Sequence, residues 1–386
     1  MDHRGGDDLW DIAMNGLAEP RYAKIKRKKE TVERYGIGES PGNFGFSLPA
    51  YTSPLEIESR IERVSKRPLP ASPFRVLDAP SILNDYYLNL LDWSRDDLVS
   101  LGLSEQLYLW SARTKSVSHL VDAPENHHIS GLSFSREGLL AVGTSDGTTE
   151  IFDASQNKKV LSLPKRVLRV SSLSWGSGIL SAGGKDGNIF NYDVRAGEHV
   201  SSFLGHSQEV CGLKWDADGT YLASGANDNN VCVWRSGCSR PRSKFTEHTA
   251  AVRAVGWCPW KKGILSTGGG TDDRTIRTWD VEKGACINRV DTGSQVCSIL
   301  FSEKYKEIIS THGYLDNSVT VWKYCSMRKI GSMTGHTDRV LHSALSPDGK
   351  VLATCAADEN LNFWNLFEYA GEGRTRRDSS GGFGFR

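Results

Sequence analysis

The sequence has no excess of charge of either sign and no long apolar run. Its 47 lysines and arginines face 46 aspartates and glutamates, a formal net charge of +1, so no global attraction to nucleic acid or anionic membranes is expected. No segment reaches the ~18 apolar residues of a membrane-spanning helix. The N-terminal MDHRGGDDLWD lacks the apolar stretch of a signal peptide. We therefore expect a protein of the nucleus and cytoplasm, with neither membrane nor nucleic acid as a partner.

Paired metal-binding cysteines and catalytic signatures are also lacking. The eight cysteines include no C-x-x-C pair, so the spacing of a zinc site is absent. Cys211, Cys232 and Cys297 adjoin valine in apolar stretches, and the cysteines are predicted to be mostly buried, reduced thiols that pack as small hydrophobic groups. Gly183-Gly184-Lys185 resembles a phosphate loop only superficially, because Asp186 follows it. We expect no metal, no cofactor and no catalytic residue, and hence a non-catalytic protein.

The sequence does contain a repeat. Short apolar stretches end in an aromatic residue every 40–45 positions, at Trp110, Phe152, Tyr192, Trp234, Trp279, Trp322 and Trp364. An aspartate lies six positions before all but the first of these, at Asp146, Asp186, Asp228, Asp273, Asp316 and Asp358. Gly-His pairs open two of the repeats. This period and these marks are typical of WD repeats, in which each repeat supplies four strands to one blade of a β-propeller.

The repeat predicts an all-β fold, a seven-bladed WD-repeat propeller. We place the blades roughly at 85–110, 128–153, 167–193, 206–235, 248–281, 294–323 and 336–366. The repeat aspartate is expected to accept hydrogen bonds from the repeat histidine and from backbone amides, which makes each blade rigid. An open ring would expose edge strands. The alternating segment Phe74-Arg75-Val76-Leu77 is therefore predicted to supply the outer strand of the last blade.

The repeats leave a tail at each end of the chain. We divide the chain into a largely disordered N-terminal tail at 1–73, the propeller at 74–368 and a flexible C-terminal tail at 369–386. The first tail has no sustained hydrophobic period, and the second is rich in glycine, serine and arginine.

A polar rim is expected on one face of the ring. The turns that carry the repeat aspartate open on that face, together with the loops that enter the innermost strands. The residues just before those strands should line the central channel; they are Arg169, Glu209, Ala251, Gln295 and Arg339. Asn227, Asn229 and Thr271 lie beside the aspartate turns. Such a set suits an extended polar peptide, and a solvated rim without a ligand is the alternative.

Several stretches resemble a known family, the Fizzy and Fizzy-related activators of the anaphase-promoting complex, a ubiquitin ligase. They are VLDAPSILNDYYLNLLDWS (76–94), GHSQEVCGLKW (205–215), AVGWCPW (254–260), GGGTDDRTIRTW (268–279), DTGSQVCSILFS (291–302) and SPDGKVLATCAADENLNFWN (346–365). The resemblance covers about residues 70–368. It implies a degron receptor whose partners are ligase subunits and degron-bearing substrates such as cyclins and securin, with spindle-checkpoint proteins as further candidates.

The resemblance also implies the sites. A KEN-box peptide would contact the polar rim through Asn227, Asn229, Thr271, Gln295 and Arg339. A destruction-box peptide would lie at the seam of the first and last blades, where Asp92 and Glu359 hold its arginine through charge-assisted bonds. A strand-end cap and an exposed turn residue are the structural alternatives for these two carboxylates.

The tails match the family less well. The family docks onto the ligase through Asp-Arg-aromatic-Ile-Pro, and here ERYGIG (33–38) keeps Arg34 and Tyr35 without the proline. The family ends in Ile-Arg, and here the last residues are Phe385 and Arg386. These four residues are the predicted ligase-docking residues.

Three hypotheses follow. The first is a substrate-recruiting ligase activator, the second a degron-binding decoy or inhibitor whose docking motifs have decayed, and the third a general WD-repeat scaffold. In GANDNNVCVW (225–234), Asp228 and Trp234 belong to the repeat. Asn227 and Asn229 are interpreted as turn residues that the repeat does not require and that are therefore available to a KEN-type peptide.

Overall fold

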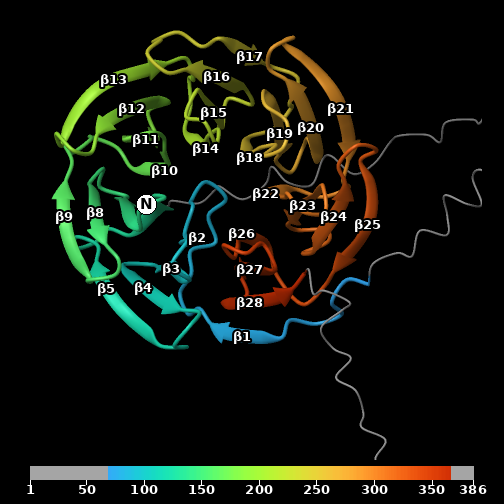
Figure 1. Cartoon of the computed structure of the whole chain (residues 1–386), viewed down its shortest axis with the longest axis horizontal. Helices are drawn as coiled ribbons and strands as arrows, with labels where there is room; N and C mark the ends of the chain where they lie inside the picture. Colours follow the sequence, from blue (N-terminus) through green and yellow to red (C-terminus); the bar gives the residue numbers. More distant parts are fainter. Residues whose placement is uncertain (1–67, 367–386) are drawn as a thin grey trace, which may run out of the picture. The chain divides into compact units, whose positions relative to one another are not determined.

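The computed structural model describes residues 68–366 of the chain. These residues form 28 strands and no helix, and the strands group into seven four-stranded antiparallel sheets. The sheets are the blades of a ring around a central channel (Figure 1). The predicted seven-bladed propeller is confirmed.

The strands follow one plan in blades 1 to 6. From the channel outward, blade 1 contains β2 (Leu91–Trp93), β3 (Leu98–Leu103), β4 (Gln106–Ser111) and β5 (Val117–Asp122). Blade 2 contains β6 (Ile129–Phe134), β7 (Leu139–Thr144), β8 (Thr149–Asp153) and β9 (Lys158–Ser162). Blade 3 contains β10 (Val170–Trp175), β11 (Ile179–Gly184), β12 (Asn188–Asp193) and β13 (Glu198–Leu204). Blade 4 contains β14 (Val210–Trp215), β15 (Tyr221–Ala226), β16 (Val231–Arg235) and β17 (Ser243–Phe245).

The remaining blades complete the ring. Blade 5 contains β18 (Val252–Trp257), β19 (Ile264–Gly269), β20 (Thr275–Asp280) and β21 (Ala285–Asp291). Blade 6 contains β22 (Val296–Ser302), β23 (Glu307–His312), β24 (Val319–Lys323) and β25 (Arg328–Met333). Blade 7 contains β26 (Val340–Leu345), β27 (Val351–Ala356) and β28 (Asn360–Asn365), with β1 (Arg75–Asp78) outermost. The predicted blade ranges thus cover the three inner strands, and in blades 1 to 6 the outer strand follows each range.

Strand β1 closes the ring as the alternating segment at 74–77 predicted. It pairs antiparallel with β28, from Arg75 opposite Phe363 to Asp78 opposite Asn360. At this seam Phe363 packs against Trp110, with ring centroids 4.6 Å apart. The last blade is therefore built from both ends of the propeller sequence, which leaves no open edge between blades 7 and 1.

A chain of hydrogen bonds explains the repeat of aspartate and aromatic residue. In blade 4, Trp234 Nε1 donates to Ser224 Oγ (2.8 Å), which lies 2.8 Å from His206 Nε2. The other ring nitrogen, Nδ1, lies 3.1 Å from the Asp228 carboxylate, which also accepts from the amide of Ser207. Burial alone would raise the pKa of Asp228, but the His206 ring and the turn amides hold it well below its usual range.

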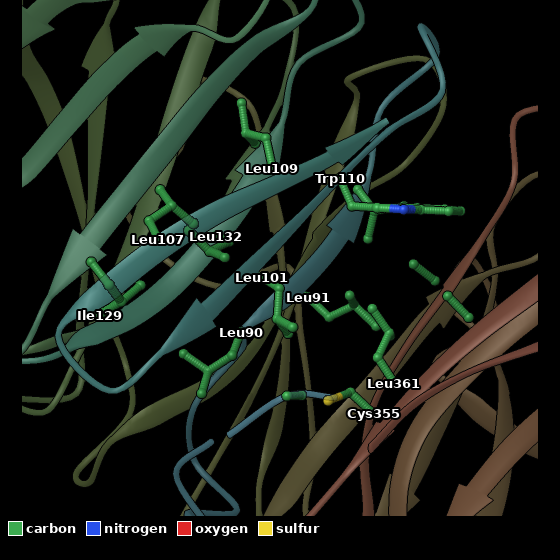
Figure 2. Close-up of a cluster of buried hydrophobic side chains, with 14 of the residues drawn as sticks. Leu90, Leu91, Leu101, Leu107, Leu109, Trp110, Ile129, Leu132, Cys355 and Leu361 are labelled. Carbon is green, nitrogen blue, oxygen red and sulfur yellow. The ribbon is translucent and has the colours of Figure 1, made fainter. Parts of the chain in front are cut away.

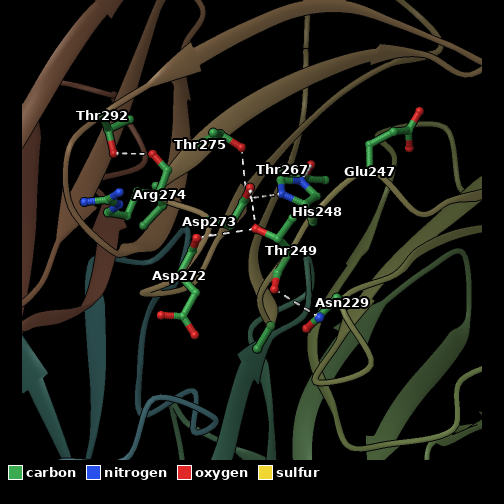
Figure 3. A network of polar contacts seen from close by, with 12 residues as sticks. Asn229, Glu247, His248, Thr249, Thr267, Asp272, Asp273, Arg274, Thr275 and Thr292 are labelled. Atoms are coloured by element: carbon green, nitrogen blue, oxygen red, sulfur yellow. Dashed lines mark hydrogen bonds and ion pairs between the residues drawn. The ribbon is translucent and has the colours of Figure 1, made fainter. Parts of the chain in front are cut away.

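The same chain recurs in two further blades. Its members are Trp279, Thr267, His248 and Asp273 in blade 5, and Trp364, Thr354, His336 and Asp358 in blade 7. Figure 3 shows the blade 5 network, with His248 between Thr267 and Asp273. The predicted histidine–aspartate contact is thus confirmed in three blades. In blade 3 the guanidinium of Arg166 replaces the histidine and donates to Asp186 (2.6 Å).

Glycines let neighbouring blades approach closely. A Cβ at Gly225 would lie 2.4 Å from the carbonyl oxygen of Val252, and one at Gly268 would lie 2.3 Å from a methyl group of Val296. Both valines begin the innermost strand of the next blade. Any side chain at these glycines would force two blades apart, which explains why the second strand of a blade is rich in glycine and other small residues.

The segment 84–90, between β1 and β2, runs into the middle of the ring (Figure 1). Tyr86 donates its hydroxyl proton to the carbonyl of Val296 (3.0 Å) on blade 6. Asn89 donates to the carbonyls of Ser171 (2.8 Å) and Cys211 (2.9 Å) on blades 3 and 4. We call residues 84–90 the plug, because they cross the channel and hold strands from opposite sides of the ring.

Apolar side chains of blades 1, 2 and 7 form one cluster that includes Leu90 of the plug. Figure 2 shows this cluster, in which Leu90 and Leu101 lie between Ile129 on one side and Leu361 on the other. Of the cysteines, Cys211, Cys232, Cys258, Cys297 and Cys355 are buried as expected, whereas Cys238 and Cys325 are exposed. Between residues 68 and 366 no helix is long and apolar enough to span a bilayer.

Candidate functional site

A polar cavity of about 700 Å³ lies at the end of the channel where the aspartate turns open. We call it the rim cavity. Its lining brings together the five predicted KEN-box contacts, Asn227, Asn229, Thr271, Gln295 and Arg339, together with Ala251, whereas Arg169 and Glu209 of the predicted rim do not line it. The five contacts come from blades 4, 5, 6 and 7, and residues 84–87 of the plug form the rest of the wall next to the channel.

Asn227 is held by the plug. Its Oδ1 accepts a hydrogen bond from the Tyr87 hydroxyl (2.8 Å), and its Nδ2 donates to Gln208 Oε1 (2.6 Å). Burial raises the pKa of Tyr87, so the phenol keeps its proton and remains a donor. The orientation of the Asn227 amide is therefore fixed before any ligand arrives.

Asn229 has a structural role that the repeat pattern did not reveal. Its φ is +65°, in the left-handed region where glycine and asparagine are favoured. The equivalent turn positions have Gly187 (φ +80°), Asn317 (φ +44°) and Glu359 (φ +61°). The repeat does not require an asparagine here, as interpreted, but the turn requires a residue that adopts positive φ, which the sequence interpretation did not recognise.

The side chain of Asn229 also ties two blades together. Its Nδ2 donates to the carbonyl of Thr249 on blade 5 (3.2 Å), as Figure 3 shows. Asn317 makes the same contact with the carbonyl of Thr337 between blades 6 and 7 (3.1 Å). The two asparagines thus share one local structure, and only Asn229 lines the rim cavity.

Arg339 and Gln295 form the buried side of the rim cavity. The Arg339 guanidinium donates through Nε to Asn84 Oδ1 (2.8 Å) and through Nη2 to the Asn84 carbonyl (2.8 Å). It also lies over the ring of Tyr314, 4.6 Å from the centroid. Gln295 is buried and Thr271 is exposed at the outer edge. A fixed cation therefore stands opposite the amides of blade 4.

Two carboxylates also line the rim cavity, and the sequence reasoning missed both. Asp272 is exposed beside Thr271. Asp85 of the plug pairs with Arg169 (2.9 Å), which also pairs with Glu209 (2.7 Å). Burial opposes the charge of Arg169, but the two carboxylates outweigh it and raise the pKa of the guanidinium. The position of Asp272 within the GGGTDD turn was the available signal.

The predicted pair of Asp92 and Glu359 is not brought together. Asp92 lies in β2 close to the β2–β3 turn, and its carboxylate accepts from the amides of Phe134 (2.7 Å) and Trp93 (2.9 Å). Glu359 lies in the turn between β27 and β28, on the face where the aspartate turns open. The two belong to opposite ends of their blades, so they cannot grip one guanidinium. The strand-end cap is the structural role of Asp92.

The seam of blades 1 and 7 has a different pair of carboxylates. A groove of about 600 Å³ lies there, and we call it the seam groove. Leu77, Leu101, Tyr108, Trp110 and Leu361 make most of its wall apolar, and Asp78 and Ser81 line one edge. Glu359 reaches this edge, because its Oε1 accepts from the amide of Ser81 (3.0 Å) and its carbonyl accepts from Ala79 (2.7 Å). Asp78 therefore replaces Asp92 as the carboxylate that neighbours Glu359.

The predicted ligase-docking residues Arg34, Tyr35, Phe385 and Arg386 lie outside residues 68–366. They stay predictions from the sequence. Among the described residues, no group of His, Cys, Asp and Glu has a geometry that could hold a metal ion.

Known proteins resemble this chain over the propeller. The family model for the CDC20/Fizzy WD40 domain matches residues 77–364. "Anaphase-promoting complex subunit cdc20" of Dictyostelium discoideum is 49% identical over 308 residues, which are 78% of this chain and 62% of that protein. "Protein FIZZY-RELATED 2" of Arabidopsis thaliana is 46% identical over 303 residues, 78% of this chain and 63% of the relative. The chain thus spans less than two thirds of the length of these relatives.

Two further comparisons agree. "WD repeat-containing protein slp1" of Schizosaccharomyces pombe is 43% identical over 336 residues, 84% of this chain and 69% of that protein. A chain in a crystal structure of the mitotic checkpoint complex superposes on this chain with a TM-score of 0.77 and is 42% identical in sequence. The match covers 86% of this chain and 100% of the chain in that structure. By its propeller sequence and its fold, this chain belongs to the CDC20/Fizzy family of WD40 proteins.

Proposed function

We propose that this protein is a substrate-recruiting activator subunit of the anaphase-promoting complex, a ubiquitin ligase. It binds KEN-box and destruction-box degrons on its propeller and performs no catalysis itself. The single observation that carries the proposal is the rim cavity, where amides, a hydroxyl, a guanidinium and an exposed carboxylate line one polar space of about 700 Å³. The names of the relatives and of the checkpoint structure support the same ligase and checkpoint proteins as partners.

The chemistry of the rim cavity matches the sequence Lys-Glu-Asn. The exposed Asp272 carboxylate suits the lysine ammonium, and the Arg339 guanidinium suits the glutamate. The side-chain amides of Asn227 and Gln295 suit the asparagine amide, because each can both donate and accept. Discrimination then comes from buried polar groups that a wrong side chain would leave unpaired.

We propose the seam groove for the destruction box. Its apolar wall of Leu101, Tyr108 and Trp110 suits a leucine side chain, and the neighbouring carboxylates of Asp78 and Glu359 suit an arginine. This assignment keeps the seam that the family resemblance implied and replaces Asp92 by Asp78.

Peptide binding tests the degron sites. Fluorescence anisotropy should show a labelled KEN peptide binding the full chain at least ~10-fold more tightly than a scrambled peptide, since one or two buried hydrogen bonds discriminate. Asn227→Ala should remove most of that difference. Asn188→Ala is the control, because the Asn188 amide is likewise hydrogen-bonded to a neighbouring side chain, that of Asp186 (2.9 Å), but does not line the rim cavity. Equal affinity for the KEN and scrambled peptides would favour the general scaffold.

A reconstituted ubiquitination assay separates the activator from a decoy. Stimulation of substrate ubiquitination by the full chain supports the activator, and competition with an authentic activator supports the decoy. Loss of stimulation in a chain with Arg34→Ala and without Phe385-Arg386 would assign ligase docking to the tails. Peptide binding should be unchanged in that variant, so the two halves of the proposal can fail separately.

A further inference from the structure

The central channel continues beyond the plug as a second cavity, which we call the pit. It has a volume of about 390 Å³, and residues from the innermost strands of all seven blades line it. The plug separates it from the rim cavity, because residues 84–87 line the rim cavity and Asn89 lines the pit. The pit therefore opens on the face opposite the aspartate turns.

The pit has a polar floor and a partly apolar mouth. Arg253, Cys297 and His342 are 5%, 1% and 2% exposed and lie near the starts of their strands, next to the plug. Trp257 and Phe301, towards the other ends of β18 and β22, are partly exposed. A ligand that entered from the open face would pass aromatic side chains before it met the buried Arg253 and His342.

Arg253 points into the channel because of a β-bulge. The register of β18 against β19 shifts between Val252 and Ala254, so Arg253 is the additional residue of the bulge. Its guanidinium donates to the carbonyls of Cys297 (2.7 Å), Leu88 (3.1 Å from Nε) and Leu341. No carboxylate contacts this guanidinium anywhere in the described part of the chain. The floor of the pit thus holds a buried positive charge satisfied only by neutral acceptors.

His342 presents a hydrogen-bond donor without an acceptor. Its Nδ1 faces two donors, the Arg253 guanidinium (2.8 Å) and the amide of Leu90 (3.4 Å), so Nδ1 is the unprotonated nitrogen. The neutral ring then carries its proton on Nε2. Burial and the Arg253 charge lower the pKa of His342 well below its usual value, which keeps the ring neutral. Its Nε2 is buried and has no hydrogen-bond partner among residues 68–366.

The remaining charged groups that line the pit indicate which charge a ligand should carry. Lys214 and Asp92 lie on its wall with opposite signs, and Asp92 accepts from two backbone amides. The hydroxyls of Ser298 and Ser343 bond to each other beside His342. With Arg253 included, the lining carries one net positive charge.

We propose that the pit is a binding site for a carboxylate. One carboxylate oxygen accepts the Nε2 proton of His342, and the negative charge balances Arg253. A buried donor without an acceptor is costly, so an acceptor at this point stabilises the folded state. A carboxylate fits better than a phosphate dianion, because it carries a single charge that matches the lining and is repelled less by Asp92. The apolar mouth tolerates the carbon skeleton attached to it.

The ring nitrogen of His342 gives a direct test in the full-length wild-type chain. Sodium chloride is replaced mole for mole by sodium acetate at constant pH and ionic strength, and the Nε2 signal of ¹⁵N-histidine-labelled protein is followed by NMR. A saturable shift of the Nε2 signal is expected. A shift that grows linearly without saturation, or the same response to sodium phosphate, would overturn the proposal.

Thermal unfolding supplies a second readout with matched variants. Acetate should raise the Tm of the wild type, because a ligand that binds only the folded state stabilises it. His342→Phe should abolish this rise, and His199→Phe should keep it, since His199 is exposed on the outer strand β13. An equal rise in the wild type and His342→Phe would contradict the site. If His342→Phe does not fold, the wild-type NMR titration decides alone.

The source of the carboxylate is separated by a pair of peptides. Acetyl-Ala-Glu-Ala-amide and its glutamine counterpart are titrated against the same Nε2 signal. Tighter binding of the glutamate peptide than of acetate assigns the site to an acidic peptide, whereas binding of acetate alone assigns it to a free small acid. Equal binding of the glutamate and glutamine peptides would show that the charge is irrelevant and would reject the proposal.

Discussion

The plug contributes to both ends of the central channel, the rim cavity and the pit. The two cavities differ in whether their buried polar groups all have hydrogen-bond partners. At the rim cavity, Asn84 and Tyr87 of the plug hold Arg339 and Asn227 in place. At the pit, the plug supplies the Leu88 carbonyl and the Leu90 amide, yet the Nε2 of His342 has no partner in the described part of the chain.

The plug therefore has two roles: it stabilises the fold of the ring, and it orients residues of the proposed binding site. The backbone amide and the side chain of Asn89 satisfy inward-facing carbonyls at the β-bulges, and the side chains of Asn84 and Tyr87 orient residues proposed to bind the degron. A change that displaces the plug backbone should therefore reach both ends of the channel, whereas the loss of a single hydrogen-bonding group, on the plug or on a wall, should stay local. The following predictions test that distinction, from the largest expected effect to the smallest.

Arg253→Met should have the largest effect. It leaves the carbonyls of Leu88, Cys297 and Leu341 without their donor, and each buried unsatisfied group costs about 1–3 kcal/mol. We expect a loss of at least about 3 kcal/mol in the free energy of unfolding by urea. Arg242→Met is the control, because its pair with Glu282 is largely exposed and should contribute little. Similar effects of the two substitutions would mean that the channel does not depend on its central cation.

His312→Gln should change how stability depends on pH. His312 is 1% exposed behind the rim cavity, and burial lowers its pKa to about 4. Below the unfolded value of about 6.5 the unfolded chain takes up a proton that the folded chain refuses, so stability is lost as pH falls from about 6.5 towards 4. One such group contributes about 2 kcal/mol between pH 6.5 and pH 5.

Urea unfolding at pH 7 and at pH 5 measures this term. The wild type should lose more stability than His312→Gln over the interval, by up to about 2 kcal/mol. His342 acts in the same direction, so the variant should keep part of the slope. His199→Gln, which changes an exposed ring, should leave the slope unaltered. Parallel pH profiles for the wild type and His312→Gln would contradict the assignment.

Tyr87→Phe should affect the rim cavity alone. It removes the hydroxyl that donates to Asn227 Oδ1 and keeps the aromatic ring of the plug. One neutral hydrogen bond is worth about 1 kcal/mol, so affinity for a KEN peptide should fall roughly 3–10-fold. Anisotropy with a destruction-box peptide, which we assign to the seam groove, should show no change. A loss for both peptides would mean that the plug acts on the whole ring.

Asn229→Gly should have the smallest effect on stability. Glycine adopts the same positive φ without strain, so the free energy of unfolding should stay within about 1 kcal/mol of the wild type. If the Asn229 amide contacts the degron, KEN-peptide affinity should still fall severalfold. Asn317→Gly is the matched control, because it removes the same inter-blade bond outside the rim cavity. Equal affinities for both variants would leave Asn229 a purely structural residue.

The rim cavity shows how far residue spacing could lead. The valine that begins the innermost strand in blades 3 to 7 and the aspartate turn both lie on one face, so the repeat spacing alone places Asn227, Gln295 and Arg339 near each other. The plug could not be foreseen in the same way. Its residues have no repeat partner, and the hydrogen bonds from its side chains to the blades join residues 82–255 positions apart in the sequence.

Asp92 shows where the family resemblance misled. The resemblance implied that Asp92 holds the degron arginine at the seam of the first and last blades, but β2 turns this carboxylate towards the opposite end of the blade, where two amides hold it. Asp78 is the last residue of the strand that closes the ring, and its place beside Glu359 follows from the pairing of β1 with β28. Which carboxylates meet at a closure depends on strand register, and the repeat spacing does not specify it.

The sequence by itself determined the period, the number of blades, the aspartate–aromatic framework and the strand that closes the ring. These features are local or repeat at a fixed interval, so hydrophobic alternation and turn chemistry are enough to specify them. Only the tertiary structure decided the path of the plug, the inward turn of Arg253 at a bulge, and the unpartnered Nε2 of His342 in the pit of the described propeller. These features depend on groups from several blades that meet in a channel, and such meetings exist only after the ring has closed.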